Sequence, residues 1–259
     1  MELMRLYNAL FENFGSQHWW PAREGSNKQL EICLGAILTQ NTSWKNAGKA
    51  IAELRKHKMI DAQKIANCNS KRLALLIRPS GYHNQKARKL KEFCAHLLKN
   101  YNGNSTKMLG KPIPELRNEL LAIHGIGNET ADSIILYAAH KPIFVIDTYT
   151  KRIVERLGIA DEKDYLKLQE FFELQLPRSA KLFNEFHALL VQFGKEFCRK
   201  KPKCGECFLN KECMFYTGAT MNKPLSRFIR KADLRDVFGT LRTNKSGQQL
   251  KDEAREGWK

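Results

Sequence analysis

The sequence lacks the marks of a membrane-spanning or secreted protein. No segment reaches the run of about eighteen apolar residues that a transmembrane helix requires. The first residues, MELMRLYNALF, contain neither a basic region nor a signal-peptide cleavage site. We therefore expect a cytoplasmic protein with no membrane partner.

Sustained alternation of apolar and polar residues is also missing, and a half-buried strand needs that period of two. The apolar run 142–146 is too short to seed a sheet. Stripes at helical spacing recur instead, beginning with the one that includes Leu3, Leu6 and Leu10. The predicted fold class is therefore all-α.

Disulfides are not expected from the seven cysteines, because cytoplasmic thiols stay reduced. Four of the seven form a C-x5-C-x2-C-x5-C array: Cys198, Cys204, Cys207 and Cys213. Four thiolates this close indicate a metal centre. One central pair flanked by single cysteines favours a [4Fe–4S] cluster, and structural zinc is the alternative.

Acidic residues are too few to balance the basic ones. The chain has 44 Lys and Arg against 27 Asp and Glu, a net charge of +17. Such an excess is typical of proteins that bind a polyanion. Nucleic acid is the predicted partner, with a merely soluble basic protein as the alternative, and a DNA ligand would place the protein at the nucleoid.

The stretch 120–152 contains the strongest local motif. Gly125 and Gly127 flank Ile126 in a tight turn between two predicted helices, which leaves backbone N–H groups free to bind a phosphate. A helix–helix turn without a ligand is the alternative. Asp147 follows a short apolar run and opens the next helix, a position that also suits a plain N-cap.

Two other segments are candidates for ligand contact. Trp19 and Trp20 precede a proline, which favours irregular chain at this point. The two indoles would either plug the core or form a surface on which a ligand stacks. Tyr82 and Lys86 belong to a turn that feeds a basic helix, which is either a second phosphate clamp or a solvated basic face.

The glycine hairpin, the aspartate twenty residues after Gly127 and the four-cysteine loop together resemble the endonuclease III superfamily of helix-hairpin-helix DNA glycosylases. The likeness covers about residues 1–216. It implies that Asp147 is the catalytic aspartate, that the four cysteines hold the cluster, and that double-stranded DNA with a damaged base is the partner. Gln40 and Asn41 would match the stretch that wedges into the duplex, and Tyr82 and Lys86 the turn that contacts its backbone.

The resemblance also implies an architecture. A six-helix domain, residues 27–141, would carry the helix-hairpin-helix and face a second domain, residues 1–26 plus 142–216, with the active site in the cleft. Residues 217–259 would form a basic extension, either a weakly ordered arm on DNA or a small helical addition. We expect a monomer.

Glu129 departs from the pattern of the strand-cutting members, which place a lysine nucleophile there. A carboxylate cannot form an imine, so a monofunctional glycosylase is predicted. Glu129 with Trp19, Trp20 and Trp44 resembles the 3-methyladenine DNA glycosylases, with the tryptophans as the base pocket. The alternatives are a monofunctional uracil or thymine mismatch, adenine or hypoxanthine glycosylase, and a non-catalytic DNA-binding paralogue.

Overall fold

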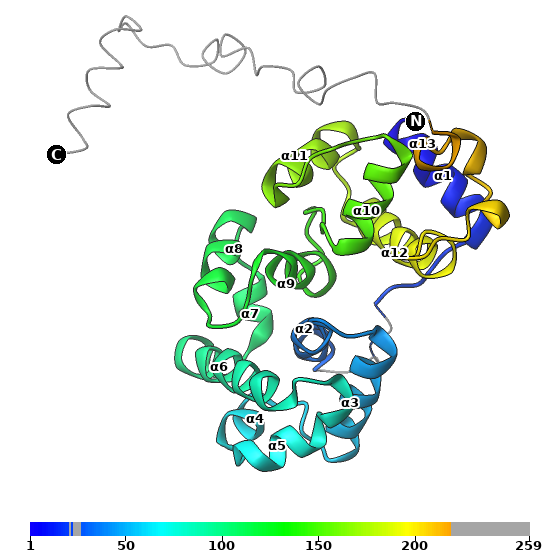
Figure 1. Ribbon diagram of the computed structural model, residues 1–259. Helices are drawn as coiled ribbons and strands as arrows, with labels where there is room; N and C mark the ends of the chain where they lie inside the picture. The colour runs from blue at the N-terminus through cyan, green and yellow to red at the C-terminus, as the bar shows by residue number, and fades with distance from the viewer. Residues whose placement is uncertain (21, 23–26, 219–259) are drawn as a thin grey trace, which may run out of the picture. The chain divides into compact units, whose positions relative to one another are not determined.

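The computed structural model of the protein describes residues 1–20, 22 and 27–218, and every regular element in them is helical (Figure 1). No strand occurs in this part of the chain, which confirms the all-α prediction. None of its helices is long and apolar enough to cross a membrane. The α-helices are α1 (Leu3–Phe14), α2 (Lys28–Leu38), α3 (Trp44–Lys56), α4 (Ala62–Asn67), α5 (Ser70–Leu76), α6 (His83–Tyr101), α7 (Ser105–Leu109), α8 (Ile113–Ala122), α9 (Asn128–Ser133), α10 (Thr148–Leu157), α11 (Tyr165–Gln175), α12 (Ala180–Glu196) and α13 (Met214–Thr217).

Short segments of other helix types complete the fold. Three are 3-10 helices: η1 (Arg78–Ser80), η3 (Cys204–Glu206) and η4 (Asn210–Glu212). The fourth, η2 (Ile134–Ala138), continues α9 as a π-helix. π-Helical turns are uncommon and often lie at functional sites. Here the π-turn includes Tyr137, a fully buried residue whose contacts are described below.

Residues 27–141 contain more helices than the six that the sequence predicts. The structure has eight α-helices there, α2 to α9. The prediction misses α4 and α7, which span six and five residues. Helices of one turn or little more carry too few residues to show a periodic apolar stripe. Each begins instead at a side-chain cap, Asp61 for α4 and Asn104 for α7.

The N-terminal helix packs against the C-terminal half of the described chain. Leu3, Leu6 and Leu10 of α1 are buried, and α1 contacts α12. The ring of Tyr7 meets Phe186 of α12 edge to face at 5.5 Å. Figure 1 shows α1 beside α12 and α13, far along the chain. The described residues belong to one compact unit, and the division of 1–216 into two domains stays a prediction. Apart from 217 and 218, the predicted extension lies outside the described residues.

Helix α2 runs through the interior of the other half. All its residues from Leu30 to Leu38 are buried, and it contacts α3, α6, α7, α9 and η2. One of them is charged, Glu31, and Arg55 of α3 donates to its carboxylate from Nε at 2.5 Å. Pairing keeps this buried charge satisfied.

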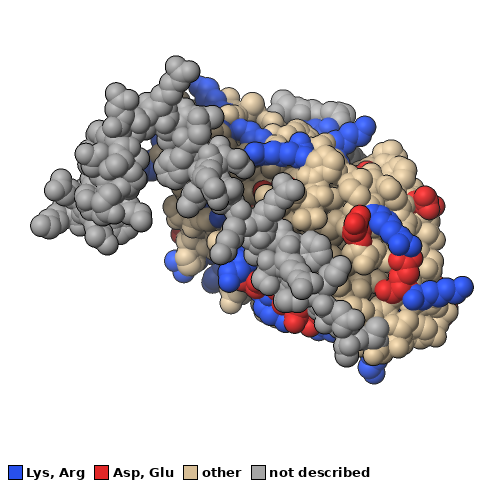
Figure 2. All heavy atoms as spheres, turned by 90° about the horizontal axis from the view of Figure 1, so that it is seen from above, with Lys and Arg blue, Asp and Glu red and all other residues tan. Residues whose placement is uncertain are grey.

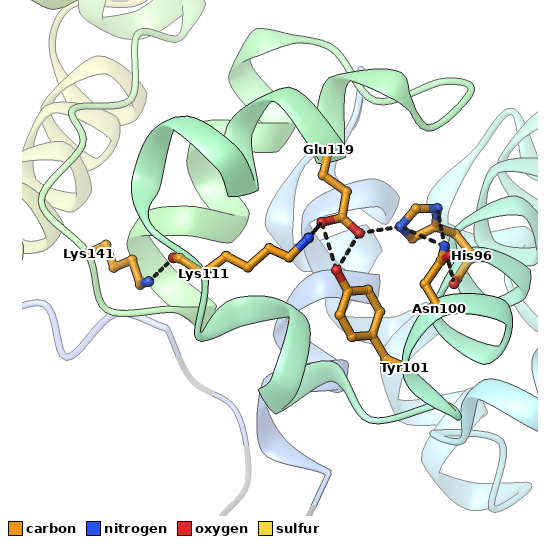
Figure 3. A network of polar contacts seen from close by, with 6 residues as sticks. All are labelled: His96, Asn100, Tyr101, Lys111, Glu119 and Lys141. Atoms are coloured by element: carbon orange, nitrogen blue, oxygen red, sulfur yellow. Dashed lines mark hydrogen bonds and ion pairs between the residues drawn. The ribbon is translucent and has the colours of Figure 1, made fainter.

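Polar contacts anchor α8, the first helix of the hairpin, to α6 (Figure 3). The Glu119 carboxylate accepts hydrogen bonds from His96 Nε2 at 2.6 Å and from Lys111 Nζ and the Tyr101 hydroxyl, each at 2.7 Å. Burial works against ionisation of Glu119, but Lys111, His96 and Tyr101 together hold its pKa below the ordinary value. The network therefore holds the first helix of the hairpin in place against α6.

Candidate active site

The hairpin has the conformation that its two glycines suggest, but only one of them needs to be glycine. Gly125 has a φ of +85°, and a Cβ there would come within 2.6 Å of Lys89 Cγ. Ile126 is buried between the helices. Gly127 is extended, with a φ of −102°, and precedes α9 without a side-chain cap. The turn therefore leaves the start of α9 open to a ligand.

Gln40 holds the hairpin from the end of α2. Its Nε2 donates to the Gly125 carbonyl at 3.0 Å and to Thr130 Oγ1 at 2.9 Å. Its Oε1 accepts from Lys89 Nζ at 2.5 Å. The neighbouring Asn41 is exposed and has a φ of 51°. Gln40, which is predicted to wedge into the duplex, is thus hydrogen-bonded to the hairpin that is predicted to bind a phosphate.

Lys86 corrects one sequence-based prediction. Its side chain is 2% exposed, and Nζ donates to the carbonyls of Leu38 at 2.8 Å and Ser80 at 2.7 Å. Burial lowers its pKa to about 8, and the charge of Lys89 adds to the shift. Lys86 therefore joins α6 to α2 from within and does not face DNA. Tyr82, at the start of α6, remains 65% exposed.

The three tryptophans predicted to form a pocket do come together. Ring centroids lie 5.3 Å apart for Trp19 and Trp20, 4.9 Å for Trp19 and Trp44, and 4.5 Å for Trp20 and Trp44, all edge to face. Gly35 of α2 makes room, because a Cβ there would lie 2.6 Å from the Trp20 ring. All three indoles are half-buried, which leaves part of each available to a ligand.

Asp147 is buried and caps α10. Its Oδ1 accepts from the Thr150 backbone N–H at 2.7 Å and from the Thr150 hydroxyl at 2.9 Å. Its Oδ2 lies 3.7 Å from Nε2 of His187 on α12. The two oxygens therefore have different surroundings: one serves the helix, and the other faces a histidine.

Glu129, in the first turn of α9, lies close enough to Asp147 for their charges to interact. The carboxyl keeps an exposed surface, yet the surrounding protein displaces much of its water. This desolvation, together with the charge of Asp147, raises the pKa of Glu129 to about 7, and Lys151 opposes the shift. Two carboxyls with unlike environments near one site are typical of catalytic centres.

A buried carboxylate that the sequence analysis missed ties α9 to two other helices. Asp132 is 0% exposed and accepts from Arg117 Nε of α8 at 2.7 Å. From α11 it accepts from the Tyr165 hydroxyl at 2.9 Å and from Gln169 Nε2 at 2.8 Å. Tyr165 also accepts from the backbone of Ile146, next to Asp147. The only sequence signal is a charged residue among the apolar positions of its helix.

The four cysteines of the C-terminal loop line one small pocket with Phe193, Phe197 and Phe215. Arg156 borders it, with Nη1 3.6 Å from Cys198 Sγ, and its carbonyl accepts from Cys213 Sγ at 3.4 Å. In the described part of the chain, no three His, Cys, Asp or Glu side chains are grouped tightly enough to hold a metal ion. Four soft ligands nevertheless line this one apolar pocket, and they suit an iron–sulfur cluster in type and number.

Together the helices, the glycine hairpin and the capping aspartate define a helix-hairpin-helix protein. Residues 34–178 match the sequence model of the HhH-GPD superfamily base excision DNA repair proteins, and the chain belongs to this superfamily. A protein of Methanocaldococcus jannaschii named "Putative DNA repair glycosylase MJ1434" is 43% identical, over 82% of this chain and 96% of its own. Endonuclease III of Thermotoga maritima is 28% identical, over 76% and 88%.

Solved structures agree with this assignment. The 3-methyladenine DNA glycosylase of H. pylori, bound to 1,N6-ethenoadenine, is 30% identical with a TM-score of 0.64, over 75% of this chain and 98% of that one. A non-covalent endonuclease III–DNA complex has a TM-score of 0.71 at 21% identity, over 84% and 98%, and shows the shared fold. DNA is the partner of this class, and Lys and Arg side chains are spread over the visible face of the protein (Figure 2).

Proposed function

We propose that this DNA glycosylase is monofunctional and releases alkylated purines such as 3-methyladenine from double-stranded DNA. The observation that carries the proposal is Glu129 beside Asp147, together with three clustered tryptophans, of which Trp20 contacts Tyr137. A glutamate at this position cannot form the imine that strand cleavage requires. The likeness to the H. pylori 3-methyladenine DNA glycosylase supports the same substrate class.

The chemistry of the substrate agrees with these residues. N3- and N7-alkylated purines carry a positive charge, so they leave the sugar with little protonation. The face of an indole attracts such a cation, by about 0.5 to 2 kcal/mol per contact, and an ionised Glu129 adds a negative charge. Asp147 stabilises the positive charge that develops on the sugar and orients the attacking water. Neutral bases such as uracil, thymine, adenine or hypoxanthine need more help at the leaving group.

An excision panel tests the proposal. The full chain is incubated with duplexes that each carry one target base: 3-methyladenine, 7-methylguanine, uracil or thymine opposite guanine, adenine opposite 8-oxoguanine, or hypoxanthine. Each reaction is then split into two samples, and one of them is treated with alkali. We expect breaks after alkali only, and fastest for the methylated purines. Faster release of a neutral base would assign a mismatch, adenine or hypoxanthine specificity, and no release from any duplex would favour the non-catalytic paralogue.

Borohydride trapping tests the monofunctional assignment separately. We expect no covalent protein–DNA product. Lys195 is the amine to check in this test. The residue is exposed, but neighbouring protein displaces part of its water and lowers its pKa, and Asp147 is near enough to oppose that shift. A trapped product that disappears in Lys195→Met would show lyase chemistry with that amine as the nucleophile.

We also propose that Cys198, Cys204, Cys207 and Cys213 hold a [4Fe–4S] cluster, with structural zinc as the alternative. The shared pocket of the four thiols supports this assignment. When bound, the cluster would fix the loop rather than take part in base release. Four lysines of the loop, Lys200, Lys201, Lys203 and Lys211, are exposed, so a rigid loop would present positive charge to DNA.

A further inference from the structure

His187 of α12 has an unusual place beside the proposed catalytic carboxylate. The residue is 8% exposed, and its Nδ1 is hydrogen-bonded to the Tyr137 hydroxyl. Nε2 is buried and has no hydrogen-bond partner, the only side-chain nitrogen or oxygen of which this is true among the described residues. The acceptor that it faces is Oδ2 of Asp147, 3.7 Å away. A buried polar group without a partner is costly and calls for an explanation.

The surroundings identify which ring nitrogen carries the proton. Burial raises the pKa of Tyr137 well above its ordinary value, and Asp147 and Glu185 add to the shift, so the hydroxyl keeps its proton. Burial lowers the pKa of His187, Asp147 opposes the shift and Lys195 adds to it, and the net lowering favours a neutral ring. A neutral ring has one proton. With that proton on Nε2, the Tyr137 hydroxyl donates to Nδ1 and Nε2–H faces the Asp147 carboxylate, so this tautomer gives both ring nitrogens an acceptor or donor.

Oδ2 of Asp147 is the oxygen that can accept a hydrogen bond from His187. Both Thr150 donors bond to Oδ1, so Oδ2 is the oxygen turned toward His187. A shift of less than an ångström would bring the two atoms to hydrogen-bond distance. Hydrogen bonds at catalytic groups are often long in the free enzyme and tighten in the complex with substrate.

We propose that His187 is a positioning residue: held by Tyr137, it donates its Nε2–H to Oδ2 of Asp147 in the DNA complex and fixes the carboxylate against the sugar. The proposal rests on the proposed function in taking Asp147 as the catalytic carboxylate. The ring of Tyr137 also lies 5.3 Å from that of Trp20. The contacts therefore run from the tryptophan cluster through Tyr137 and His187 to Asp147.

Paired substitutions test this role in the full chain. His187→Leu removes the donor, whereas Gln places an amide nitrogen the same number of bonds from the backbone as Nε2. Tyr137→Phe removes the hydroxyl that holds the ring and keeps the contact with Trp20. Tyr7→Phe is the matched control, since it deletes another tyrosine hydroxyl, on α1, and keeps the ring contact with Phe186 of α12.

For His187→Leu we expect single-turnover base release to fall about tenfold or more, with DNA affinity changed less than about twofold. His187→Gln should recover most of the rate, Tyr137→Phe should be intermediate, and Tyr7→Phe should match the wild type. An unchanged rate in His187→Leu, or no recovery with Gln, would overturn the proposal. If the leucine variant does not fold, Tyr137→Phe against Tyr7→Phe decides the question.

Histidine nitrogen NMR tests the same contact without catalysis. In the ¹⁵N-histidine spectrum of the wild type, the signal missing from His187→Gln identifies His187. We expect a neutral ring protonated at Nε2, with an Nε2–H resonance that moves in Asp147→Asn and on binding undamaged duplex. Protonation at Nδ1, or no response to Asp147→Asn, would refute the contact. A wild type that releases no base would instead refute the proposed function.

Discussion

The side-chain amide of Gln40 donates to the backbone carbonyl of Gly125 across 3.0 Å, so the predicted wedge and the predicted phosphate-binding turn are joined. Lys89 completes the link through Gln40 Oε1. A phosphate on the hairpin would compete for that ammonium. We therefore expect DNA binding and release of the Gln40 side chain to be coupled through Lys89.

Gln40→Ala should slow base release from duplex DNA about tenfold, and from single-stranded DNA much less. A side chain that fills the gap lowers the cost of unpairing, a cost that single strands do not have. Single-turnover rates on both substrates measure the difference. The control is Gln29→Ala, which changes a glutamine of α2 whose side-chain oxygen accepts from the Thr106 hydroxyl. Equal losses on both substrates would mean that Gln40 only supports the hairpin.

Asp147→Asn should reduce base release by about two to three orders of magnitude while DNA binding persists, because charge stabilisation is lost. Asparagine also caps helices well, so stability should change by less than about 1 kcal/mol. Rates, binding and urea unfolding are measured together. Asp164→Asn is the matched control, since Asp164 caps α11 in the same way, 3.0 Å from the Lys167 N–H. Retained activity in Asp147→Asn would remove this residue from the mechanism.

Glu129 predicts a pH dependence near neutrality. The folded-state pKa is about 7 against an ordinary 4.5, so between these values the unfolded chain loses the proton first and ionisation works against folding. The stability advantage of Glu129→Gln over the wild type should therefore grow as the pH rises from 4.5 to 7, and it should stay constant above pH 7. Urea unfolding across this range measures it. Release of a methylated purine should rise through pH 7 only in the wild type.

The control for this pH dependence is Glu170→Gln, which changes an exposed carboxyl on α11. It should follow the wild type in both measurements. A wild-type rate that is flat across pH 7, or one that falls, would show that the ionised form of Glu129 does not assist release.

Lys86→Met should destabilise the fold by about 1–3 kcal/mol, because the carbonyls of Leu38 and Ser80 lose their donor. DNA affinity should not change at equal salt. Arg88→Met is the control: this side chain is 69% exposed, and its loss should alter stability by less than about 0.5 kcal/mol. Urea unfolding and salt titrations of DNA binding provide both quantities. If DNA binding by Lys86→Met depended less on salt than binding by the wild type, Lys86 would be a phosphate contact after all.

Protein purified without oxygen should be brown and contain about four iron and four sulfide atoms per chain. Cys213→Ser should lose that content and expose the loop to protease. Cys68→Ser changes a cysteine outside the loop and should lose neither. Zinc at one atom per chain would establish the alternative centre, and the absence of any metal would reject both.

Local patterns were enough to predict several features. The helical class, the glycine hairpin and the position of Asp147 at a helix start follow from spacing over a few residues, since caps, turns and periodic burial are local interactions. The four cysteines are recognisable for the same reason. Even so, α4 and α7 were missed, because one turn shows no period.

Contacts between distant segments required the folded chain. Lys86 looks like a surface cation in sequence, yet folding places it on carbonyls that lie 48 and 6 residues away. Tyr137 and His187 are 50 residues apart and meet beside Asp147. The sequence alone therefore established which groups the chain possesses and where its longer helices lie. Tertiary packing assigned their partners and charge states, because burial and hydrogen bonding depend on neighbours in space rather than along the chain.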